Sequence, residues 1–572
     1  MQLVIAEKPS VARDLARVLG VPARGKTSFE SSDRVITWCV GHLVELVEPA
    51  EYDARWKTWR LDVLPMIPSR FELRPNRETP EQFRAVTALL RDKRFHEVVN
   101  ACDAGREGEL IFRYVYDIAR SRIPVRRLWI SSMTDEAIRD GFAKLRPGVQ
   151  FEALGDAARC RSEADWLVGM NTTRAVTLRF RPRDAERTVF SIGRVQTPTL
   201  AMIVERDKAI ESFVPADYHV VRGTFRSAKG ERFDARWSFG DRARLANEEL
   251  AKQIVTRDTA VGSRTHAHGP RVERVDAKTV REPPPLLFDL TSLQRTANQR
   301  FGFTAARTLE ITQSLYERHK AVTYPRTDSR HLTKDLRAAV PGVVRALQSI
   351  GAYAPFAGAL LPSPPDPGRR VFDDAKVTDH HAIIPTATLA SHARFDRDEE
   401  RIFDLVARRF LAAFHPDAVF DQTDVTVRVG TGDSTPTTTS PDERDQPIGQ
   451  LPPGPDRYRV RGRVRRVAGW QAVAGIDETR AAKGRRGSKD DAGDEGDGDD
   501  ASAIELPALK AGDPLDGTFA AQHKQTRPPK RYTEAALLGA MESAGRQIDE
   551  DELRIAMKDR GLGTPATRAS IV

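Results

Sequence analysis

The sequence has 572 residues, of which 40% are hydrophobic and 30% are charged, with a formal net charge of +9. A chain this long cannot fold around one core, so we expect several domains, and the basic excess favours polyanions such as nucleic acid. The cysteines Cys39, Cys102 and Cys160 form no CxxC pair, so we expect neither a zinc ribbon nor a disulfide framework. The start, MQLVIAEKPS, lacks the features of a signal peptide and no stretch is long and apolar enough to span a membrane, so we expect a cytoplasmic protein.

The first predicted elements are two strand–loop–helix units. Residues 2–6 form an apolar strand followed by a helix, and residues 96–101 form a second strand that leads through Asp103 into another helix. Two such units predict a parallel α/β domain over about residues 1–150. In a sheet of this kind ligands collect at the carboxyl ends of the strands, where both Glu7 and Asp103 lie.

The rest of the chain alternates between helical and strand-rich stretches. Helical periodicity is found in 151–206, 286–320 and 532–572, and strand-like alternation in 218–280, 424–429 and 457–467. Because a helical block separates the strand-rich stretches, we expect at least one discontinuous domain. Two further stretches differ in composition, and we expect a loop in 430–456 and disorder in 475–503.

The seven residues from Asp103 to Glu109, Asp-Ala-Gly-Arg-Glu-Gly-Glu, concentrate carboxylates after the second strand. Glycine allows a tight turn there, and carboxylates are hard oxygen ligands for Mg²⁺, which needs only one or two of them with water and phosphate. We predict a magnesium site made by Glu7, Asp103 and Glu107, with Lys8 facing a phosphate as a point charge. Taken alone, the loop is equally compatible with a solvated acidic turn.

A second candidate is the segment Thr323-Tyr-Pro-Arg-Thr-Asp-Ser329, which is too polar for a core strand. A tyrosine hydroxyl has a pKa near 10 and attacks phosphorus only when cations stabilise the phenolate and the anionic transition state. Arg326 would share a face with Tyr324 in an extended segment and clamp a phosphate. On its own, the tripeptide Tyr-Pro-Arg is more typical of a turn in which Tyr324 packs and Pro325 fixes the bend.

Both segments resemble known motifs. Glu7 after a first strand, followed by the loop from Asp103, is similar to the Toprim domain, although Gly105 stands where that family commonly has a second Asp. The tyrosine segment resembles the active site of the type IA DNA topoisomerases. More stretches resemble the same family in the same order, namely Ser191-Ile-Gly-Arg-Val-Gln-Thr-Pro-Thr-Leu200, Phe288-Asp-Leu-Thr-Ser-Leu-Gln294, Asp379-His-His-Ala-Ile-Ile-Pro-Thr386 and Gly561-Leu-Gly-Thr-Pro-Ala-Thr-Arg568. Gly41-His-Leu-Val-Glu-Leu46 and the region from Tyr52 to Trp59 are similar to the bacterial topoisomerase III branch.

This resemblance implies a multidomain, toroidal type IA architecture that combines α/β, α and β parts. The implied parts are a Toprim metal-binding domain (1–150), a discontinuous helical DNA-binding domain (151–215 and 505–572), a strand-rich arch with insertions near 430–456 and 475–503 (216–280 and 395–504), and a helical domain that carries the tyrosine (281–394). Family members continue past the last matching stretch, which leaves open whether the final domain is complete at Val572.

The resemblance also implies a reaction: ATP-independent, magnesium-dependent breakage and rejoining of single-stranded DNA through a 5′-phosphotyrosine, with relaxation of negative supercoils and decatenation. Tyr324 would be the nucleophile, and Arg326, Lys8, Glu7 and His380 would assist, with His381 as the alternative to His380 and Lys8 protonating the departing 3′ oxygen. The DNA strand would be contacted by Ser191, Ile192, Gly193, Arg194, Val195, Gln196, Gln294, Arg106 and Arg174.

The expected partner is single-stranded DNA within supercoiled or catenated duplex, bound by a monomer that associates with the nucleoid and uses neither ATP nor a membrane. A protein partner such as a helicase stays open. Two other interpretations of the sequence also remain at this point. A Toprim primase or nuclease would keep the acidic loop but has no use for Tyr324, and a catalytically inactive DNA-binding protein is suggested by the carboxylate missing at Gly105.

Overall fold

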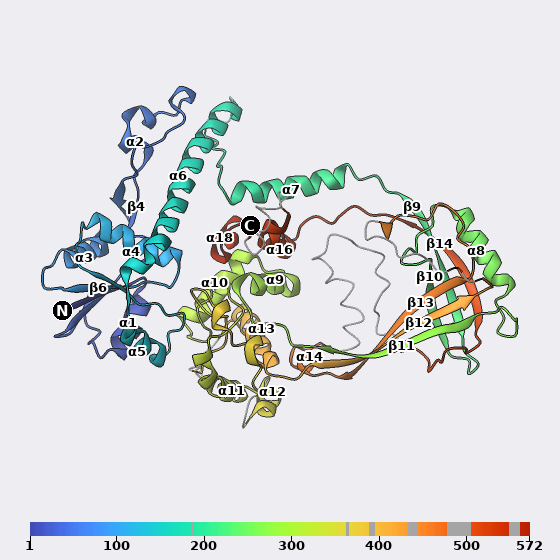
Figure 1. Ribbon diagram of the computed structural model, residues 1–572. Helices are drawn as coiled ribbons and strands as arrows, with labels where there is room; N and C mark the ends of the chain where they lie inside the picture. Colours follow the sequence, from blue (N-terminus) through green and yellow to red (C-terminus); the bar gives the residue numbers. More distant parts are fainter. Residues whose placement is uncertain are drawn as a thin grey trace. The chain divides into compact units, whose positions relative to one another are not determined.

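The computed structural model describes residues 1–182, 184, 187–361, 365–387, 395–432, 434, 443–476, 505–547 and 561–572. They form two compact units (Figure 1). The first contains Met1–Met202, Leu286–Phe410 and Leu537–Val572, and the second contains Ile203–Pro285 and Leu411–Ala536. Of the two expected insertions, residues 433, 435–442 and 477–503 lie outside the described part of the chain.

The first unit begins with a six-stranded sheet in the order β2-β3-β1-β6-β7-β8. Its four central strands, β3, β1, β6 and β7, run parallel, and the edge strands β2 and β8 are antiparallel to their neighbours. The strands are β1 (Gln2–Ala6), β2 (Ser28–Glu30), β3 (Arg34–Trp38), β6 (Glu97–Ala101), β7 (Val125–Arg127) and β8 (Arg146–Pro147). The predicted parallel α/β domain is thus confirmed.

Helices cover both faces of this sheet because alternate strand residues point to opposite sides. Leu3 and Val98 pack with α3 (Pro80–Leu90) and α4 (Arg106–Ile118) in one apolar core. Val4 and Val99 pack with α1 (Pro9–Val18) and α5 (Asp135–Ala143) in the other. Figure 1 shows α3 and α4 on one side of the sheet and α1 and α5 on the other, which makes a three-layer α/β/α domain.

The register of the two central strands brings the acidic residues to one edge. Ala6 of β1 is paired with Ala101 of β6, so the chain leaves both strands at the same level just before Glu7 and Asp103. Gly108, in the first turn of α4, is required by packing, since a Cβ there would lie 2.3 Å from the Asp103 carbonyl oxygen. The close approach lets α4 begin immediately beside the loop.

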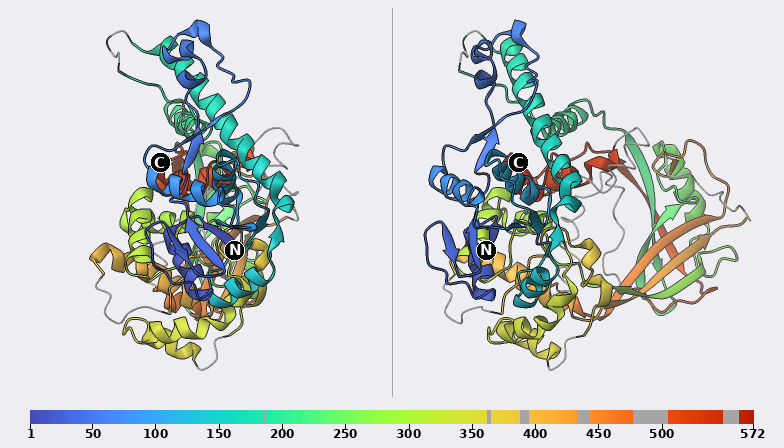
Figure 2. Two further views of the ribbon diagram at one scale, coloured as in Figure 1. Left: turned by 90° about the vertical axis from the view of Figure 1, so that its left-hand side faces the viewer. Right: turned by 60° about the vertical axis from the view of Figure 1, so that its left-hand side comes forward.

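A long helix, α6 (Glu152–Phe180), follows this domain, and the segment between β4 (Val44–Leu46) and β5 (Leu73–Pro75) runs beside it in both views of Figure 2. Trp166 of α6 joins the two, because its ring packs edge-on against Tyr52 and Phe71 and its Nε1 donates to the Val47 carbonyl oxygen. The short elements here are α2 (Pro49–Tyr52), η1 (Ala54–Lys57), η2 (Leu61–Val63) and η3 (Gly148–Phe151).

The next helices lie mainly in the later segments of the first unit. Helix α9 begins with a capping box made by Asp289 and Ser292 and ends at Gly302, whose φ of +70° suits glycine. The elements are α7 (Gln196–Glu211), α9 (Leu290–Phe301), α10 (Ala305–Glu317), η4 (Lys334–Ala338), α11 (Val340–Gln348), α12 (Ala354–Leu360), η5 (Gly368–Arg370), η6 (Asp374–Lys376), α13 (Arg397–Ala413), α16 (Glu534–Ser543), η8 (Ala544–Gln547) and α18 (Pro565–Ile571).

The second unit is a fully antiparallel sheet in the order β11-β12-β13-β10-β9-β14. Its elements are β9 (Asp217–Arg226), β10 (Arg232–Ser238), α8 (Glu248–Ala260), β11 (Arg271–Glu282), β12 (Ala418–Val429), β13 (Asp456–Val467), α14 (Trp470–Val473) and β14 (Asp516–Gln525). The predicted strands within 218–280, 424–429 and 457–467 are confirmed. Helix α8 was not predicted in this range, and it forms because Asn247 caps it and Leu250, Ala251 and Ile254 pack on the sheet.

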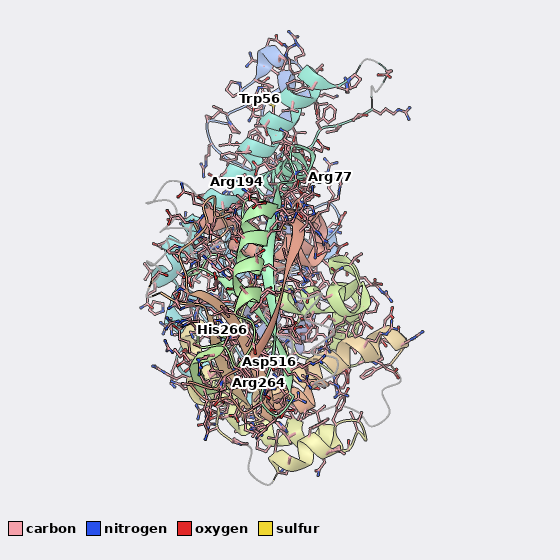
Figure 3. All side chains as sticks on the ribbon, turned by 90° about the vertical axis from the view of Figure 1, so that its right-hand side faces the viewer. Trp56, Arg77, Arg194, Arg264, His266 and Asp516 are labelled. Carbon is pink, nitrogen blue, oxygen red and sulfur yellow. The ribbon has the colours of Figure 1, made fainter. Side chains whose placement is uncertain are left out.

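Strand β14 corrects the expectation that 505–572 is helical. Its pairing with β9 buries Phe519 against Phe225 and Tyr458, whose ring centroids lie 5.8 and 5.2 Å from that of Phe519. At its start, Asp516 pairs with Arg264 at 3.1 Å (Figure 3). Strand β9 and Arg264 are both far from β14 in the sequence, so local periodicity did not indicate this strand. Among the described residues, no helix combines the length and apolar character needed to cross a membrane.

Candidate active site

The carboxyl ends of β1 and β6 bring Glu7, Lys8 and Asp103 together. The Asp103 backbone N–H donates to Glu7 Oε2 at 3.2 Å. Lys8 Nζ lies 2.9 Å from Asp103 Oδ2 and 3.6 Å from Glu7 Oε1. The three side chains are 11% (Glu7), 25% (Lys8) and 15% (Asp103) exposed, so water screens their charges poorly.

The pKa values of these groups show how the charges are balanced. Burial, and then the charge of Asp103, raises the pKa of Glu7 to about 7. Burial opposes ionisation of Asp103, but hydrogen bonding to His380 and the charge of Lys8 hold the pKa of Asp103 below its ordinary value. Burial lowers the pKa of Lys8, and the two carboxylates outweigh it and raise that pKa overall. A further positive charge would help Glu7 to ionise, so this donor set fits a bound cation.

The loop after α10 presents Tyr324 to this cluster. Thr327 Oγ1 donates to the His380 carbonyl oxygen at 2.8 Å, which ties the loop to the segment around His380. Lys8 Nζ lies 3.9 Å from the centroid of the Tyr324 ring. Burial raises the pKa of Tyr324, while the charge and hydrogen bonding of Lys8 act in the opposite direction. Lys8 therefore contacts the phenol and the acidic loop at once.

The structure distinguishes His380 from His381. The His380 ring packs 4.3 Å from the Tyr324 ring, and its Nε2 lies 3.1 Å from Asp103 Oδ2. His381 turns away, and its Nδ1 donates to the Ala382 carbonyl oxygen at 2.8 Å. Burial lowers the pKa of His381 to about 4, which keeps this ring neutral. His380 is thus the histidine that the fold brings to the predicted nucleophile.

These residues line a narrow pocket of about 60 Å³, whose walls include Lys8, Asp103, Tyr324, Asp379 and His380. Tyr316 of α10 closes one side and packs edge-on against Tyr324 with ring centroids 5.5 Å apart. The described residues include no group of three His, Cys, Asp or Glu side chains placed to hold a metal ion.

Comparison with known proteins identifies the family. Residues 2–133 match the family described as the Toprim domain, and residues 150–572 match the family described as DNA topoisomerase. DNA topoisomerase 3 of Bacillus cereus (strain ATCC 14579) is 39% identical over 575 residues, which cover 100% of this chain and 71% of that protein. The chain belongs to the type IA DNA topoisomerases, in the bacterial topoisomerase III branch.

Two more relatives support the same assignment. DNA topoisomerase 3 of Bacillus subtilis (strain 168) is 37% identical over 578 residues, and that of Shouchella clausii (strain KSM-K16) is 39% identical over 579 residues. Both alignments cover 100% of this chain, with 71% of the first protein and 70% of the second. The solved structure of full-length topoisomerase I from Thermotoga maritima has the same fold, with a TM-score of 0.61 at 19% identity, covering 100% of this chain and 77% of that one. The topoisomerase therefore begins with a Toprim domain, which is a metal-binding fold.

A buried ion pair supports the acidic loop of the topoisomerase, and no sequence pattern indicated it. Glu109 is fully buried and pairs with Arg127 at 3.1 Å; the two side chains are 2% and 1% exposed. The Arg127 guanidinium also donates to the carbonyl oxygens of Asn100, Cys102 and Asp103 at 3.1, 2.7 and 2.6 Å. Because one side chain binds this whole turn, Arg127 fixes the position of Asp103. A lone arginine in a short strand gave no sequence signal of this role.

Glu107 and Arg106 lie at the exposed start of α4. Glu107 is 68% exposed, and its Oε1 lies 2.5 Å from His42 Nε2. This hydrogen bond, with the charges of His42 and Arg161, lowers the pKa of Glu107. The structure thus brings Glu7 and Asp103 together and leaves Glu107 paired with His42, while Arg106 is exposed beside the loop.

Three of the predicted residues lie away from the pocket. Arg326 is exposed and lines a separate hollow between α10 and α18. Gln294 is fully buried in α9, where its Nε2 donates to the Ala305 carbonyl oxygen at 2.9 Å. Arg174 is 7% exposed and donates to the carbonyl oxygen of Trp56, which Figure 3 labels beside α6. Gln294 is buried where α9 meets the start of α10, and Arg174 is buried beneath the segment of Trp56 and Trp59, with its guanidinium carbon 5.2 Å from the centroid of the Trp59 ring, so a role of either in DNA binding stays a prediction.

The predicted DNA-binding stretch from Ser191 to Gln196 forms the loop between α6 and α7. Gln196 Nε2 donates to Ser191 Oγ at 2.8 Å, and the Ile192 N–H donates to Thr173 Oγ1 of α6 at 2.9 Å. Arg194, labelled in Figure 3, is exposed and pairs with Asp165 of α6 at 3.0 Å. Gly193 and Val195 complete the loop, whose outer side is open to solvent at Ser191 and Arg194.

Proposed function

We propose that the Tyr324 hydroxyl of this topoisomerase cuts one strand of DNA, that DNA passes through the break, and that the same bond exchange rejoins the strand with Mg²⁺ and without ATP. The observation that carries this proposal is the contact of Lys8 with both the Tyr324 ring and Asp103. A phenol and a Toprim carboxylate that share one cation are placed for chemistry on a single phosphodiester.

The cleavage step is a transesterification. Tyr324 Oη attacks a backbone phosphorus, the bond between phosphorus and the 3′ oxygen breaks, and the tyrosine becomes joined to the 5′ phosphate. The phenol loses a proton and the departing 3′ oxygen gains one, so no nucleotide cofactor is consumed. Religation is the reverse attack by the 3′ hydroxyl, which releases the tyrosine.

Lys8 and Glu7 are suited to different parts of this step. Because its neighbours raise the pKa of Lys8, this side chain stays protonated and acts as a fixed positive charge beside the phenolate and the phosphate. Glu7 has a pKa of about 7, which suits a group that exchanges a proton at neutral pH. We therefore assign protonation of the departing oxygen to Glu7 in the state without bound metal, and charge stabilisation to Lys8, which revises the role expected for Lys8 from sequence. Once Mg²⁺ binds, Glu7 would be ionised and would serve as a ligand.

His380 and the carboxylates complete the site. His380 links Tyr324 to Asp103 and holds both in place through its ring contact and its hydrogen bond. Glu7 and Asp103 would hold Mg²⁺ with water, and Glu107 would join them by leaving His42; two carboxylates suffice for this ion. When bound, Mg²⁺ supplies positive charge at the phosphate and 3′ end that are to be rejoined.

The remaining predicted residues are proposed to serve DNA binding. The exposed loop of residues 191–196 and Arg106 would contact the strand, and Arg326 would reach a phosphate from the neighbouring hollow. Gln294 and Arg174 would act indirectly, since both are buried and hold helices in position. The enzyme would act as a monomer on single-stranded regions of supercoiled or catenated DNA.

The test of this function uses purified enzyme with negatively supercoiled plasmid and with singly catenated circles, one of which carries a single-stranded gap. With Mg²⁺ and no ATP, we expect stepwise relaxation and separation of the circles, both of which stop when EDTA is added. A primase or nuclease would leave nicked or linear DNA, or new polymer. A DNA-binding protein without activity would shift the plasmid on a gel and leave its linking number unchanged, and either result would contradict the proposal.

A substitution at Lys8 tests the shared cation. Lys8→Met should slow covalent capture of single-stranded DNA by about 10²–10³-fold, because it removes one preorganised positive group from the transition state. Quenched-flow formation of the protein–DNA adduct measures this rate. Lys144→Met is the matched control, since Lys144 is 77% exposed and pairs only with Asp140 at 3.1 Å among the contacts of the described chain. Equal rates for Lys8→Met and the control would show that Lys8 does not assist cleavage.

A further inference from the structure

Gly105 lies at the point where the acidic loop turns into α4, and the space beside it is already occupied. A Cβ built on Gly105 would lie 2.1 Å from Asp379 Oδ2 and 2.3 Å from Asp379 Cγ. A side chain at 105 would fit only if the Asp379 side chain moved aside, so the volume that a residue at 105 would fill holds the carboxyl group of Asp379. Sequence comparison indicated a carboxylate missing at 105, and the structure places another one there.

The backbone around Asp379 is fixed from two directions. Ser131 Oγ of the Toprim domain donates to the Thr378 carbonyl oxygen at 2.7 Å, and Thr378 Oγ1 donates to Asp328 Oδ1 at 2.5 Å. On the other side of Asp379, the His380 ring contacts Asp103. Asp379 lines the same pocket as Lys8 and Asp103. The carboxylate also lies at the N-terminus of α4, where the helix dipole favours a negative charge.

We propose that Asp379 supplies the carboxylate that the Toprim loop lacks at Gly105 and helps to hold the divalent cation through one of the water molecules bound to it. The proposal rests on the magnesium site proposed above. It takes the water-mediated form because no three ligating side chains converge among the described residues, and because Mg²⁺ keeps several of its waters in protein sites. Gly105 and Asp379 are thus a compensating pair: the small residue makes room for a carboxylate from a segment more than 270 positions away.

The test is a cycle of variants in which the carboxylate is removed from 379 and returned at 105. Binding of Mn²⁺, as a stand-in for Mg²⁺, is measured on the full chain by electron paramagnetic resonance without DNA. Asp379→Asn should weaken Mn²⁺ binding by about 10-fold or more, as expected for a group that orients a metal-bound water. Gly105→Asp alone should not strengthen binding, because its side chain would displace the Asp379 carboxyl group from the same space and leave the number of carboxylates there unchanged. The double variant Gly105→Asp/Asp379→Ala should return the affinity to within about threefold of wild type.

Two reference variants separate the failure of this inference from failure of the metal site. Asp103→Asn removes a proposed direct ligand and should abolish Mn²⁺ binding. Asp374→Asn removes an exposed carboxylate of the same segment, which pairs with Lys334 at 3.4 Å, and should leave the affinity unchanged. If Asp103→Asn weakens binding and Asp379→Asn does not, the role of Asp379 is wrong while the metal site stands. If neither has an effect, the metal site itself is wrong. A third outcome would refute the exchange between positions 105 and 379. In it, Asp379→Asn weakens Mn²⁺ binding and the double variant does not restore it, although both proteins melt at the wild-type temperature.

Discussion

Tyr324→Phe should abolish covalent capture of DNA, with at least about a 10³-fold loss, because the variant lacks the only atom that can form the phosphotyrosine bond. The aromatic ring remains, and with it the contacts to Lys8 and His380. We therefore expect single-stranded DNA to bind with nearly the wild-type affinity. The adduct is measured with labelled single-stranded DNA on a denaturing gel, and binding by fluorescence anisotropy.

Tyr316→Phe is the control for this experiment. Tyr316 carries the other phenol of the pocket, 5.5 Å from Tyr324 between ring centroids, and burial raises the pKa of its hydroxyl. Its removal should leave covalent capture in place. If the adduct persists in Tyr324→Phe and disappears in Tyr316→Phe, the nucleophile is Tyr316, and the account is contradicted.

Arg127→Met should destabilise the Toprim domain by about 3 kcal/mol, because it removes the fully buried guanidinium from Glu109 and leaves that carboxylate with Arg113 and Asn100 as its partners. It also removes the donor to the Cys102 and Asp103 carbonyl oxygens, so the acidic loop should lose its fixed geometry. Urea denaturation followed by tryptophan fluorescence measures the change in the free energy of unfolding. This change is taken from the unfolding transition of the Toprim domain.

The adjacent Arg126→Met is a matched control with the same change on the exposed side of β7. Arg126 is 43% exposed and lies 3.7 Å from Glu97, so its loss should cost less than about 1 kcal/mol. A double variant, Arg127→Met/Glu109→Leu, should recover part of the stability, since an apolar pair of suitable volume can replace a buried ion pair. Equal stability of Arg127→Met and Arg126→Met would refute the structural role of this pair.

The acidic half of the site was predictable from sequence because it depends on a local rule. Two apolar strands followed by helices indicate neighbouring parallel strands, and residues just after such strands meet at one edge of the sheet. Glu7 and Asp103 meet in this way, as the pairing of Ala6 with Ala101 shows. Tyr324 was found only through its resemblance to a family motif, since the tripeptide Tyr-Pro-Arg by itself is more typical of a turn.

What the sequence could not indicate are the contacts between segments that are far apart. The filling of the space at Gly105 by Asp379 joins two loops with no shared pattern, so the missing carboxylate looked like a simple loss. Gln294 and Arg174 carry polar side chains typical of DNA contacts, but α10 covers Gln294 and the segment of Trp56 and Trp59 covers Arg174. Glu109 had no predicted role in the acidic run, and only its contact with Arg127 showed that it supports the loop.

The central claim is that Tyr324 joins itself to the 5′ phosphate of cleaved DNA, and mass spectrometry of the trapped adduct tests it most directly. Single-stranded DNA labelled at its 3′ end is incubated with enzyme and Mg²⁺, the protein is denatured, and the label that it retains is measured. The adduct is then digested with protease and nuclease for mass spectrometry. We predict that the denatured protein retains the 3′ label and that one peptide, containing Tyr324, carries a nucleotide through its 5′ phosphate. A nucleotide on any other residue, or a protein that retains a 5′ label instead, would contradict the mechanism.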